Sequence, residues 1–239
     1  MAAPQVAVVV GAGPGLGFAV ARRFAAGGFH VALMSRTAER VEALAQQIVK
    51  DGHQATGVAV DVTDAHSVKA AFDSVRKKLG DPSVLVYNAN TSFPWPPPKF
   101  MDITPEHFEG SIAAQATGAF YAAQEVLPAM IDKKSGTILL TGATASLRGG
   151  ASFATLAVGK FALRALGQSL AREFHPQGIH VAHVIVDGQI RSERYASPSR
   201  APDSFLDSDA LAEQYWQLHV QDKTVWTHEL DVRPYLEKF

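Results

Sequence analysis

The stretch that decides the fold is Gly11-Ala12-Gly13-Pro14-Gly15-Leu16-Gly17. It follows the apolar run Val6–Val10 and opens a segment in which Leu16, Val20 and Phe24 recur every four residues, as on one face of a helix. Glycine lets the backbone turn sharply and approach a phosphate closely because it has no Cβ. The N-terminus of the following helix offers free N–H groups and a partial positive charge. We interpret the stretch as a phosphate-binding turn between a strand and a helix, with a simple tight turn as the alternative.

The same alternation of short β-branched runs and longer segments of helical period continues along the chain, as in βαβ units on a parallel sheet. The expected strands are Gln5–Val10, His30–Met34, Gln54–Val60, Ser83–Tyr87, Gly136–Thr141, Gly178–Val186 and Val225–Val232. The expected helices are Leu16–Ala26, Thr37–Lys50, Ala65–Leu79, Thr104–Ile131, Ser152–Phe174 and Asp209–His219. Right-handed crossovers would wind them into an α/β fold, a single Rossmann-like, doubly wound parallel sheet of about seven strands with helices on both faces. No repeat or linker divides the chain, so residues 1–239 are expected to form one domain.

Composition narrows the class of protein. The chain has 239 residues, 47% of them hydrophobic, and a net charge of −1, which argues against a nucleic-acid partner or an acidic membrane surface. It has no cysteine, which excludes disulfides and thiolate metal sites. His180 and His183 would point to opposite faces of a strand, so we expect no metal site. The run Val6–Val10 is too short to cross a membrane and lacks a basic region before it, so we expect a cytoplasmic protein.

Two segments interrupt the regular pattern. The first, at about 91–103, contains the proline-rich Phe93–Pro98, and the second, at about 188–208, contains the Ser-, Pro- and Arg-rich Arg191–Asp207. Both follow expected strands, so both should emerge at the carboxyl edge of the sheet, where ligands bind in such folds. They are either substrate-side loops or ordinary surface loops.

The glycine spacing does not fit G-x-G-x-x-G, but it fits G-x-x-x-G-x-G with Gly11, Gly15 and Gly17. With this spacing the chain resembles the short-chain dehydrogenase/reductase family over essentially its whole length. Further stretches lie in register with family motifs, namely Asp61-Val62, Asn88-Ala89, the segment from Lys160 to Glu173, and Asp187-Gly188-Gln189-Ile190. The resemblance implies a nicotinamide cofactor held by Gly11, Gly13, Gly15, Leu16, Gly17, Ser35, Arg36, Asp61, Val62, Asn88, Ala89, Lys160, Gly188 and Ile190.

The residues after the second strand bear on which cofactor is bound. An enzyme that uses NAD places an acidic side chain there to bind the ribose 2′-hydroxyl, whereas this chain has Ser35-Arg36-Thr37. A guanidinium can pair with a 2′-phosphate, so we expect NADP(H) to be preferred over NAD(H). The alternative is that Arg36 only caps a solvated helix start.

Family members use an Asn-Ser-Tyr-Lys set, in which the tyrosine is the general acid/base. By position, only the lysine is present here, as Lys160; the other three positions hold Gln115, Ala143 and Leu156. The tyrosine position of related enoyl reductases holds Phe153. We expect Lys160 to bind the cofactor, with ribose hydroxyls as partners, and Gln115 to bond a neighbouring backbone group.

Other polar side chains near these positions could substitute for the lost groups. The candidates are Thr144, Ser146, Tyr87, Tyr195 and Asp187. For each, a structural role is the simpler expectation: Tyr87 in the core, and Thr144 and Ser146 as hydrogen-bonding loop residues.

The sequence therefore favours an NADP(H)-dependent oxidoreductase that acts on an unknown small carbonyl or alcohol with atypical or weak catalysis. Candidate walls of the substrate pocket are Phe93, Trp95 and Tyr195. The alternatives are a catalytically inactive NADP(H)-binding sensor or interaction protein, and a structural subunit without a ligand. The resemblance implies a homodimer or homotetramer, which agrees with the many apolar residues in the helix from Thr104.

Overall fold

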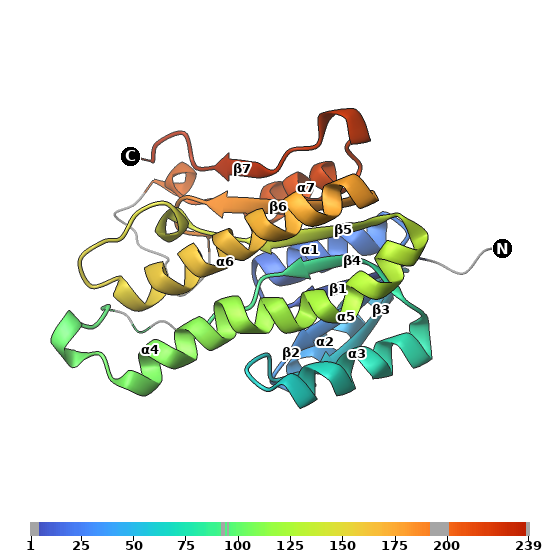
Figure 1. Ribbon diagram of the computed structural model, residues 1–239, viewed down its shortest axis with the longest axis horizontal. Helices are drawn as coiled ribbons and strands as arrows, with labels where there is room; N and C mark the ends of the chain where they lie inside the picture. The colour runs from blue at the N-terminus through green and yellow to red at the C-terminus, as the bar shows by residue number, and fades with distance from the viewer. Residues whose placement is uncertain (1–4, 92–93, 95, 192–200, 238–239) are drawn as a thin grey trace.

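The computed structural model describes residues 5–91, 94, 96–191 and 201–237. Among them, seven strands form one parallel sheet in the order β3-β2-β1-β4-β5-β6-β7 (Figure 1). The strands are β1 Val6–Val10, β2 His30–Ser35, β3 Gln54–Ala59, β4 Pro82–Tyr87, β5 Gly136–Thr141, β6 Ile179–Val186 and β7 Glu229–Val232. This order confirms the predicted Rossmann-like α/β sheet.

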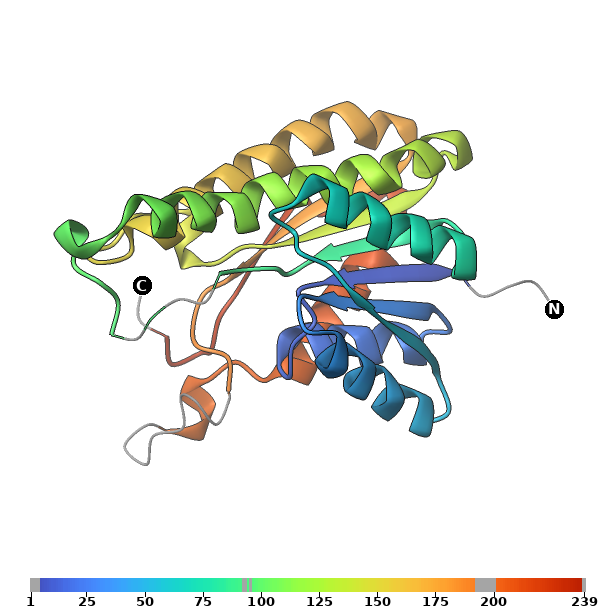
Figure 2. The same ribbon diagram turned by 90° about the horizontal axis from the view of Figure 1, so that it is seen from below.

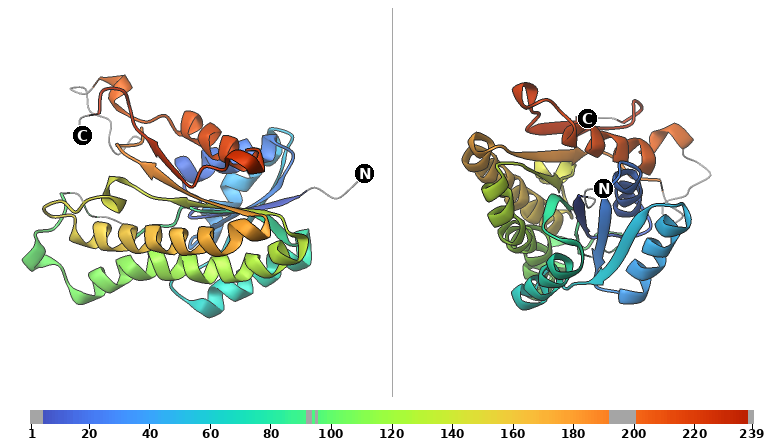
Figure 3. Two further views of the ribbon diagram at one scale, coloured as in Figure 1. Left: turned by 45° about the horizontal axis from the view of Figure 1, so that its top comes forward. Right: turned by 90° about the vertical axis from the view of Figure 1, so that its right-hand side faces the viewer.

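Helices cover both faces of the sheet because its strands are apolar on both sides. Figure 2 and Figure 3 show α3, α4, α5 and α6 on one face and α1, α2 and α7 on the other. The alternation of β1 explains this: Val8 joins the core beneath α3, α5 and α6, whereas Val9 joins the core beneath α1, α2 and α7. The helices are α1 Leu16–Ala26, α2 Ala38–Lys50, α3 Ala65–Leu79, α4 Pro105–Ile112, α5 Gly118–Lys133, α6 Ala154–Phe174 and α7 Ser208–His219.

The largest departures from the expected elements lie in the fourth helix and the last strand. The helix expected over Thr104–Ile131 is interrupted by a π-helical turn at Ala113–Thr117, which separates α4 from α5. The last strand was expected from Val225, but Lys223–Val225 forms a 3-10 turn and Trp226 stacks on His180 with ring centroids 4.7 Å apart. Such changes of hydrogen-bonding pattern leave little trace in hydrophobic periodicity.

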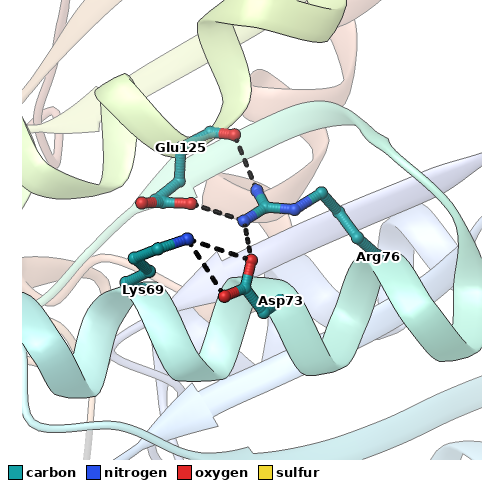
Figure 4. A network of polar contacts seen from close by, with 4 residues as sticks. All are labelled: Lys69, Asp73, Arg76 and Glu125. Atoms are coloured by element: carbon teal, nitrogen blue, oxygen red, sulfur yellow. Dashed lines mark hydrogen bonds and ion pairs between the residues drawn. The ribbon is translucent and has the colours of Figure 1, made fainter.

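A polar network joins α3 to α5 on the outer side of the core that lies beneath α3, α5 and α6 (Figure 4). Arg76 donates to the backbone oxygen of Glu125 at 3.0 Å and to its carboxylate at 2.6 Å, and the same guanidinium reaches Asp73 at 2.5 Å. Lys69 pairs with the other side of Asp73 at 3.1 Å. The pairs are partly exposed, so their contribution to stability is small, and only the bonds from Arg76 to Glu125 connect the two helices.

The sheet reverses its order of winding between β1 and β4, and the carboxyl ends of these strands form the topological switch point. The segments that follow β4, β6 and β7 emerge at this same edge, at the left of Figure 1. In this fold class the crevice at that edge is the usual ligand site, so the candidate functional residues are sought there. Within the described residues, no helix is both long and apolar enough to span a bilayer.

One glycine at the start of α5 is required by packing. A Cβ on Gly118 would lie 2.3 Å from Tyr87 Oη and 2.7 Å from the Val62 carbonyl oxygen. We expect Gly118→Ala to destabilise the protein by about 1–3 kcal/mol, because buried neighbours must move. The matched control is Gly110→Ala in α4, where a Cβ meets nothing within 4 Å. That change should be neutral or stabilising by up to about 1 kcal/mol. Urea denaturation measures both, and equal effects would contradict the packing argument.

Candidate functional site

The glycine turn is locked against the end of β4. Gly11 has a φ of +85°, and a Cβ there would lie 2.5 Å from the backbone nitrogen of Ala89. Asn88 Nδ2 donates to the carbonyl oxygen of Gly11 at 3.0 Å. Gly17 is needed because its Cβ would lie 2.6 Å from that same oxygen. The predicted residues Gly11, Gly17, Asn88 and Ala89 are therefore brought together, and the turn accepts no side chain at either glycine.

The outer side of the turn is open. A Cβ on Gly13 or on Gly15 would meet nothing within 4 Å. Gly15 is the N-cap of α1 and has no side chain to accept from the first-turn amides, among them those of Leu16 and Gly17. These N–H groups, with the positive end of the helix behind them, are suited to bind phosphate oxygens. The chemistry of this donor set fits the diphosphate of a dinucleotide.

The residues expected at the nucleoside end lie on the neighbouring strands β2 and β3. Arg36 is exposed directly after β2, and the Ser35 hydroxyl is buried without a hydrogen-bond partner among the described residues. Asp61 accepts from the Thr63 hydroxyl at 2.7 Å and from its backbone nitrogen at 2.9 Å. These bonds, with a smaller contribution from Arg36, lower the pKa of Asp61. Half-buried Val62 follows, so the expected group is brought to one edge.

Gln115, at the asparagine position, lies in the π-helical turn and is fully buried. Its Nε2 donates to Ser111 Oγ at 2.7 Å, so its partner is a side chain and not the backbone group expected from the sequence. Its Oε1 is buried without a partner among the described residues. The amide fits because position 159 is glycine, where a Cβ would lie 2.6 Å from Gln115 Nε2.

Lys160 is buried on α6, with an exposed fraction of 4%. Its Nζ donates to the carbonyl oxygen of Thr141, at the end of β5, at 2.7 Å. Burial lowers the pKa of Lys160 to about 8. The amine therefore already has a protein partner, and pairing with ribose hydroxyls stays a prediction.

His183 is a buried group whose part in this region the sequence did not indicate. It is fully buried on β6, and burial lowers its pKa to about 4. Its Nδ1 lies 3.7 Å from Glu229 Oε1, and Glu229 is held by two hydrogen bonds from Arg164 at 2.6 and 2.8 Å. A Cβ on Gly142 would lie 2.2 Å from His183 Nε2, so the glycine before Ala143 makes room for the imidazole. That glycine is the only sequence signal of the contact.

The serine and tyrosine positions hold half-buried Ala143 and Leu156, which carry no exchangeable proton. The Ala143 backbone nitrogen donates to Ser146 Oγ at 3.1 Å, which confirms Ser146 as a hydrogen-bonding loop residue. Tyr87 is also confirmed as a core residue, because it is fully buried and donates to the Ala114 carbonyl oxygen at 2.6 Å.

Polar groups do meet at the ends of β5 and β6. Thr144 Oγ1 donates to Asp187 Oδ1, and Arg233 Nη1 lies 3.2 Å from Asp187 Oδ2. Arg233 directly follows β7. Gly188, with a φ of +143°, packs against Pro234 of the same segment.

The second loop is anchored where the structure describes it. Ile190 forms a parallel bridge with Leu206, which joins the two ends of the segment between β6 and α7. The predicted pocket walls Phe93, Trp95 and Tyr195 lie outside the described residues. No three potential metal ligands gather anywhere in the described part of the chain.

A family model described as short chain dehydrogenase matches residues 5–197. The chain belongs to the short-chain dehydrogenase family. Members of this oxidoreductase family use nicotinamide cofactors and act on small molecules.

The sequence of this short-chain dehydrogenase aligns over most of its length with those of two relatives. Oxidoreductase UcpA of Escherichia coli (strain K12) is 31% identical over 214 residues, which is 87% of this chain and 80% of that protein. The 3-oxoacyl-[acyl-carrier-protein] reductase MabA of Mycobacterium tuberculosis (strain ATCC 25618 / H37Rv) is 32% identical over 204 residues, 85% of this chain and 75% of that protein.

Solved structures show the same likeness. A short-chain dehydrogenase from Rhodopseudomonas palustris superposes with a TM-score of 0.82 at 33% identity, covering 97% of this chain and 99% of that one. A metagenomic short-chain oxidoreductase in complex with NADP gives a TM-score of 0.84 at 27% identity, covering 98% and 99%.

The buried amine of Lys160 predicts a pH-dependent stability. Its pKa falls from 10.5 to about 8 on folding, so between these values the unfolded chain binds a proton that the folded chain has released. The free energy of unfolding should therefore rise with pH across this window, by up to about 3 kcal/mol in total. Urea denaturation of wild type and Lys160→Met at several pH values isolates the effect, since other groups titrate in both. A difference between the two proteins that stays constant with pH would contradict it.

Proposed function

We propose that this short-chain dehydrogenase is an NADP(H)-dependent oxidoreductase that acts on a small carbonyl or alcohol with slow or unusual acid–base chemistry. The observation that carries the proposal is the turn between β1 and α1, which is closed against Asn88 and Ala89 on one side and open over Gly13 and Gly15 on the other. Bound cofactor would supply or accept a hydride. The chain's own part is to hold the nucleotide and to move the proton that accompanies the hydride.

Preference for NADP(H) is supported by charge at the end of β2. The residue between Ser35 and Thr37 is the exposed Arg36, and not an acidic residue that would bind a ribose 2′-hydroxyl. A guanidinium binds a phosphate through charge-assisted hydrogen bonds, typically about 1.5–3 kcal/mol each. One similar structure, the metagenomic oxidoreductase, is itself a complex with NADP.

A second function is favoured by a specific observation, the loss of polar atoms at Ala143 and Leu156. A protein that bound NADP(H) without turnover would need neither a serine nor a tyrosine there. It would act as a nucleotide sensor or interaction protein, and its association with a partner would depend on NADP(H). Reproducible substrate turnover by the purified protein would rule this function out.

We also propose that the chain acts as a homodimer or homotetramer in the cytoplasm, with residues 1–239 as one domain. Support for self-association comes from exposed apolar side chains on α5 and α6, namely Phe120, Val158 and Phe161, whose exposed fractions are 44%, 40% and 42%. Apolar side chains that recur on adjacent helices are typical of protein interfaces.

The cofactor preference can be measured by fluorescence titration with NADPH and NADH. We expect wild type to bind NADPH more tightly than NADH, and Arg36→Ala to weaken NADPH binding by about 10- to 100-fold because the phosphate loses its guanidinium. Affinity for NADH should not change. The control is Lys50→Ala, an exposed cation at the far end of α2. If neither nucleotide bound to wild type, the proposed function would be abandoned in favour of an interaction protein.

Restoring the family's side chains tests the chemistry separately. The double change Ala143→Ser, Leu156→Tyr should raise turnover of simple aldehydes by NADPH, by as much as about 10²-fold, because it returns a general acid beside Lys160. The affinity for NADPH should stay the same. Steady-state rates and titrations of the double variant, with each single variant as control, measure both quantities. No gain in a folded protein would count against a reductase site at this edge.

A further inference from the structure

Two side chains that the family does not use for catalysis meet beside the lost serine position. Thr144 follows Ala143 in a 3-10 helix at the end of β5, and Asp187 follows β6, the neighbouring strand. Thr144 Oγ1 donates its hydrogen bond to Asp187 Oδ1. The contact joins residues 43 positions apart and lies at the carboxyl edge, where the substrate loops also begin.

Because Thr144 is the donor in this pair, its Oγ1 can still accept a hydrogen bond from another group. The hydroxyl proton of Thr144 is given to Asp187 Oδ1, and Arg233 pairs with the other oxygen, Oδ2, at 3.2 Å. The side chain of Asp187 is 9% exposed, whereas Thr144 is only half-buried. A hydroxyl that donates its one proton still has lone pairs to accept a bond from a ligand. Thr144 is therefore the less buried end of a hydrogen-bonded pair that leads inward to a carboxylate.

The groups at the family's usual catalytic positions cannot exchange a proton with a substrate in this way. Ala143 and Leu156 have no exchangeable proton, and the amine of Lys160 is 4% exposed and bonded to the Thr141 carbonyl oxygen. Ser146 is fully buried and already accepts from the backbone of Ala143. Thr144, at the end of β5, is a half-buried residue, and its hydroxyl is hydrogen-bonded to a carboxylate.

A purely structural role for the carboxylate is not required by the packing around it. The C-terminal strand is held by its ladder with β6, including the bond from the Asp187 backbone nitrogen to the Val232 carbonyl oxygen at 2.9 Å. Arg233 also has a second carboxylate partner, Asp231. The segment after β7 thus has anchors that do not involve the side chain of Asp187.

We propose that Thr144 and Asp187 form the proton-transfer pair of this site, in place of the lost tyrosine and serine, and that Arg233 is the positioning residue that orients the carboxylate. The inference rests on the proposed oxidoreductase function and adds the residues that perform its proton step.

In the direction of alcohol oxidation, the substrate hydroxyl gives its proton to Thr144 Oγ1 while Thr144 passes its own proton to Asp187 Oδ1. Bound oxidised nicotinamide would accept the hydride, which leaves with the electron pair of the broken carbon–hydrogen bond. The oxygen left behind uses the electrons of its broken O–H bond to form the carbonyl. In reduction the same path runs backwards, and Asp187 supplies the proton through Thr144.

The test uses the purified full chain with 1-phenylethanol and NADP⁺, and with 4-nitrobenzaldehyde and NADPH, followed by nicotinamide absorbance. We expect Thr144→Val and Asp187→Asn each to lower kcat by about 10²–10⁴-fold, with KM and nucleotide affinity within about twofold of wild type. Thr144→Ser keeps the hydroxyl and should restore most of the rate. Arg233→Lys should lower kcat by a smaller factor. The control is Asp231→Asn, which removes the other carboxylate beside Arg233 and should leave kcat unchanged.

Nucleotide titrations and thermal melts of every variant separate the possible failures. The inference is overturned if Thr144→Val and Asp187→Asn keep the wild-type kcat, or if Thr144→Ser is as slow as Thr144→Val. It is also overturned if wild type binds NADP⁺ but turns over neither substrate above the buffer blank. Absence of NADP⁺ binding by wild type would instead reject the proposed function, and the inference with it. Should Asp187→Asn melt at a much lower temperature than wild type, the two Thr144 variants decide the question.

Discussion

The close approach of two backbone segments, at Gly11 and at Asn88-Ala89, is the constraint on which the carboxyl edge depends. A positive φ and the absence of a Cβ at Gly11 let the end of β1 lie against the end of β4, and the Asn88 amide ties the two together. This contact fixes the direction in which α1 starts, and with it the direction of its free amides. Everything that the site is proposed to bind is placed relative to that helix N-terminus.

Much of the fold could be predicted from local pattern. The strands are short apolar runs and the helices have clear apolar stripes, so six of the expected strands both begin and end within one residue of their observed bounds. The π-helical turn around Gln115 was not predictable, because one extra residue per turn hardly disturbs the stripe. The last strand was placed too early because the apolar Trp226 was assigned to it. In the structure this side chain lies before the strand and stacks on His180.

The candidate site, like the fold, could be predicted from the sequence only in part. The glycine turn could be predicted because the residues that form it are consecutive in the sequence. The other expected cofactor residues follow from the family resemblance. The contacts among Thr144, Asp187 and Arg233 could not, because they join three strand ends that are distant in sequence. Nor could the burial of Lys160 against Thr141 be read from a helix pattern, since it depends on which way a long side chain turns.

Three glycines line the region where side chains depart from the family pattern, and each leaves room for a larger neighbour: Gly118 for Tyr87, Gly142 for His183, and Gly159 for Gln115. The last pair couples two distant positions of the chain. A Cβ at position 159 would lie 2.6 Å from Gln115 Nε2, so any side chain there would require the Gln115 amide to move from the place where it donates to Ser111. The side chains tolerated at 159 therefore depend on the residue at 115, and substitutions at the two positions should not be additive.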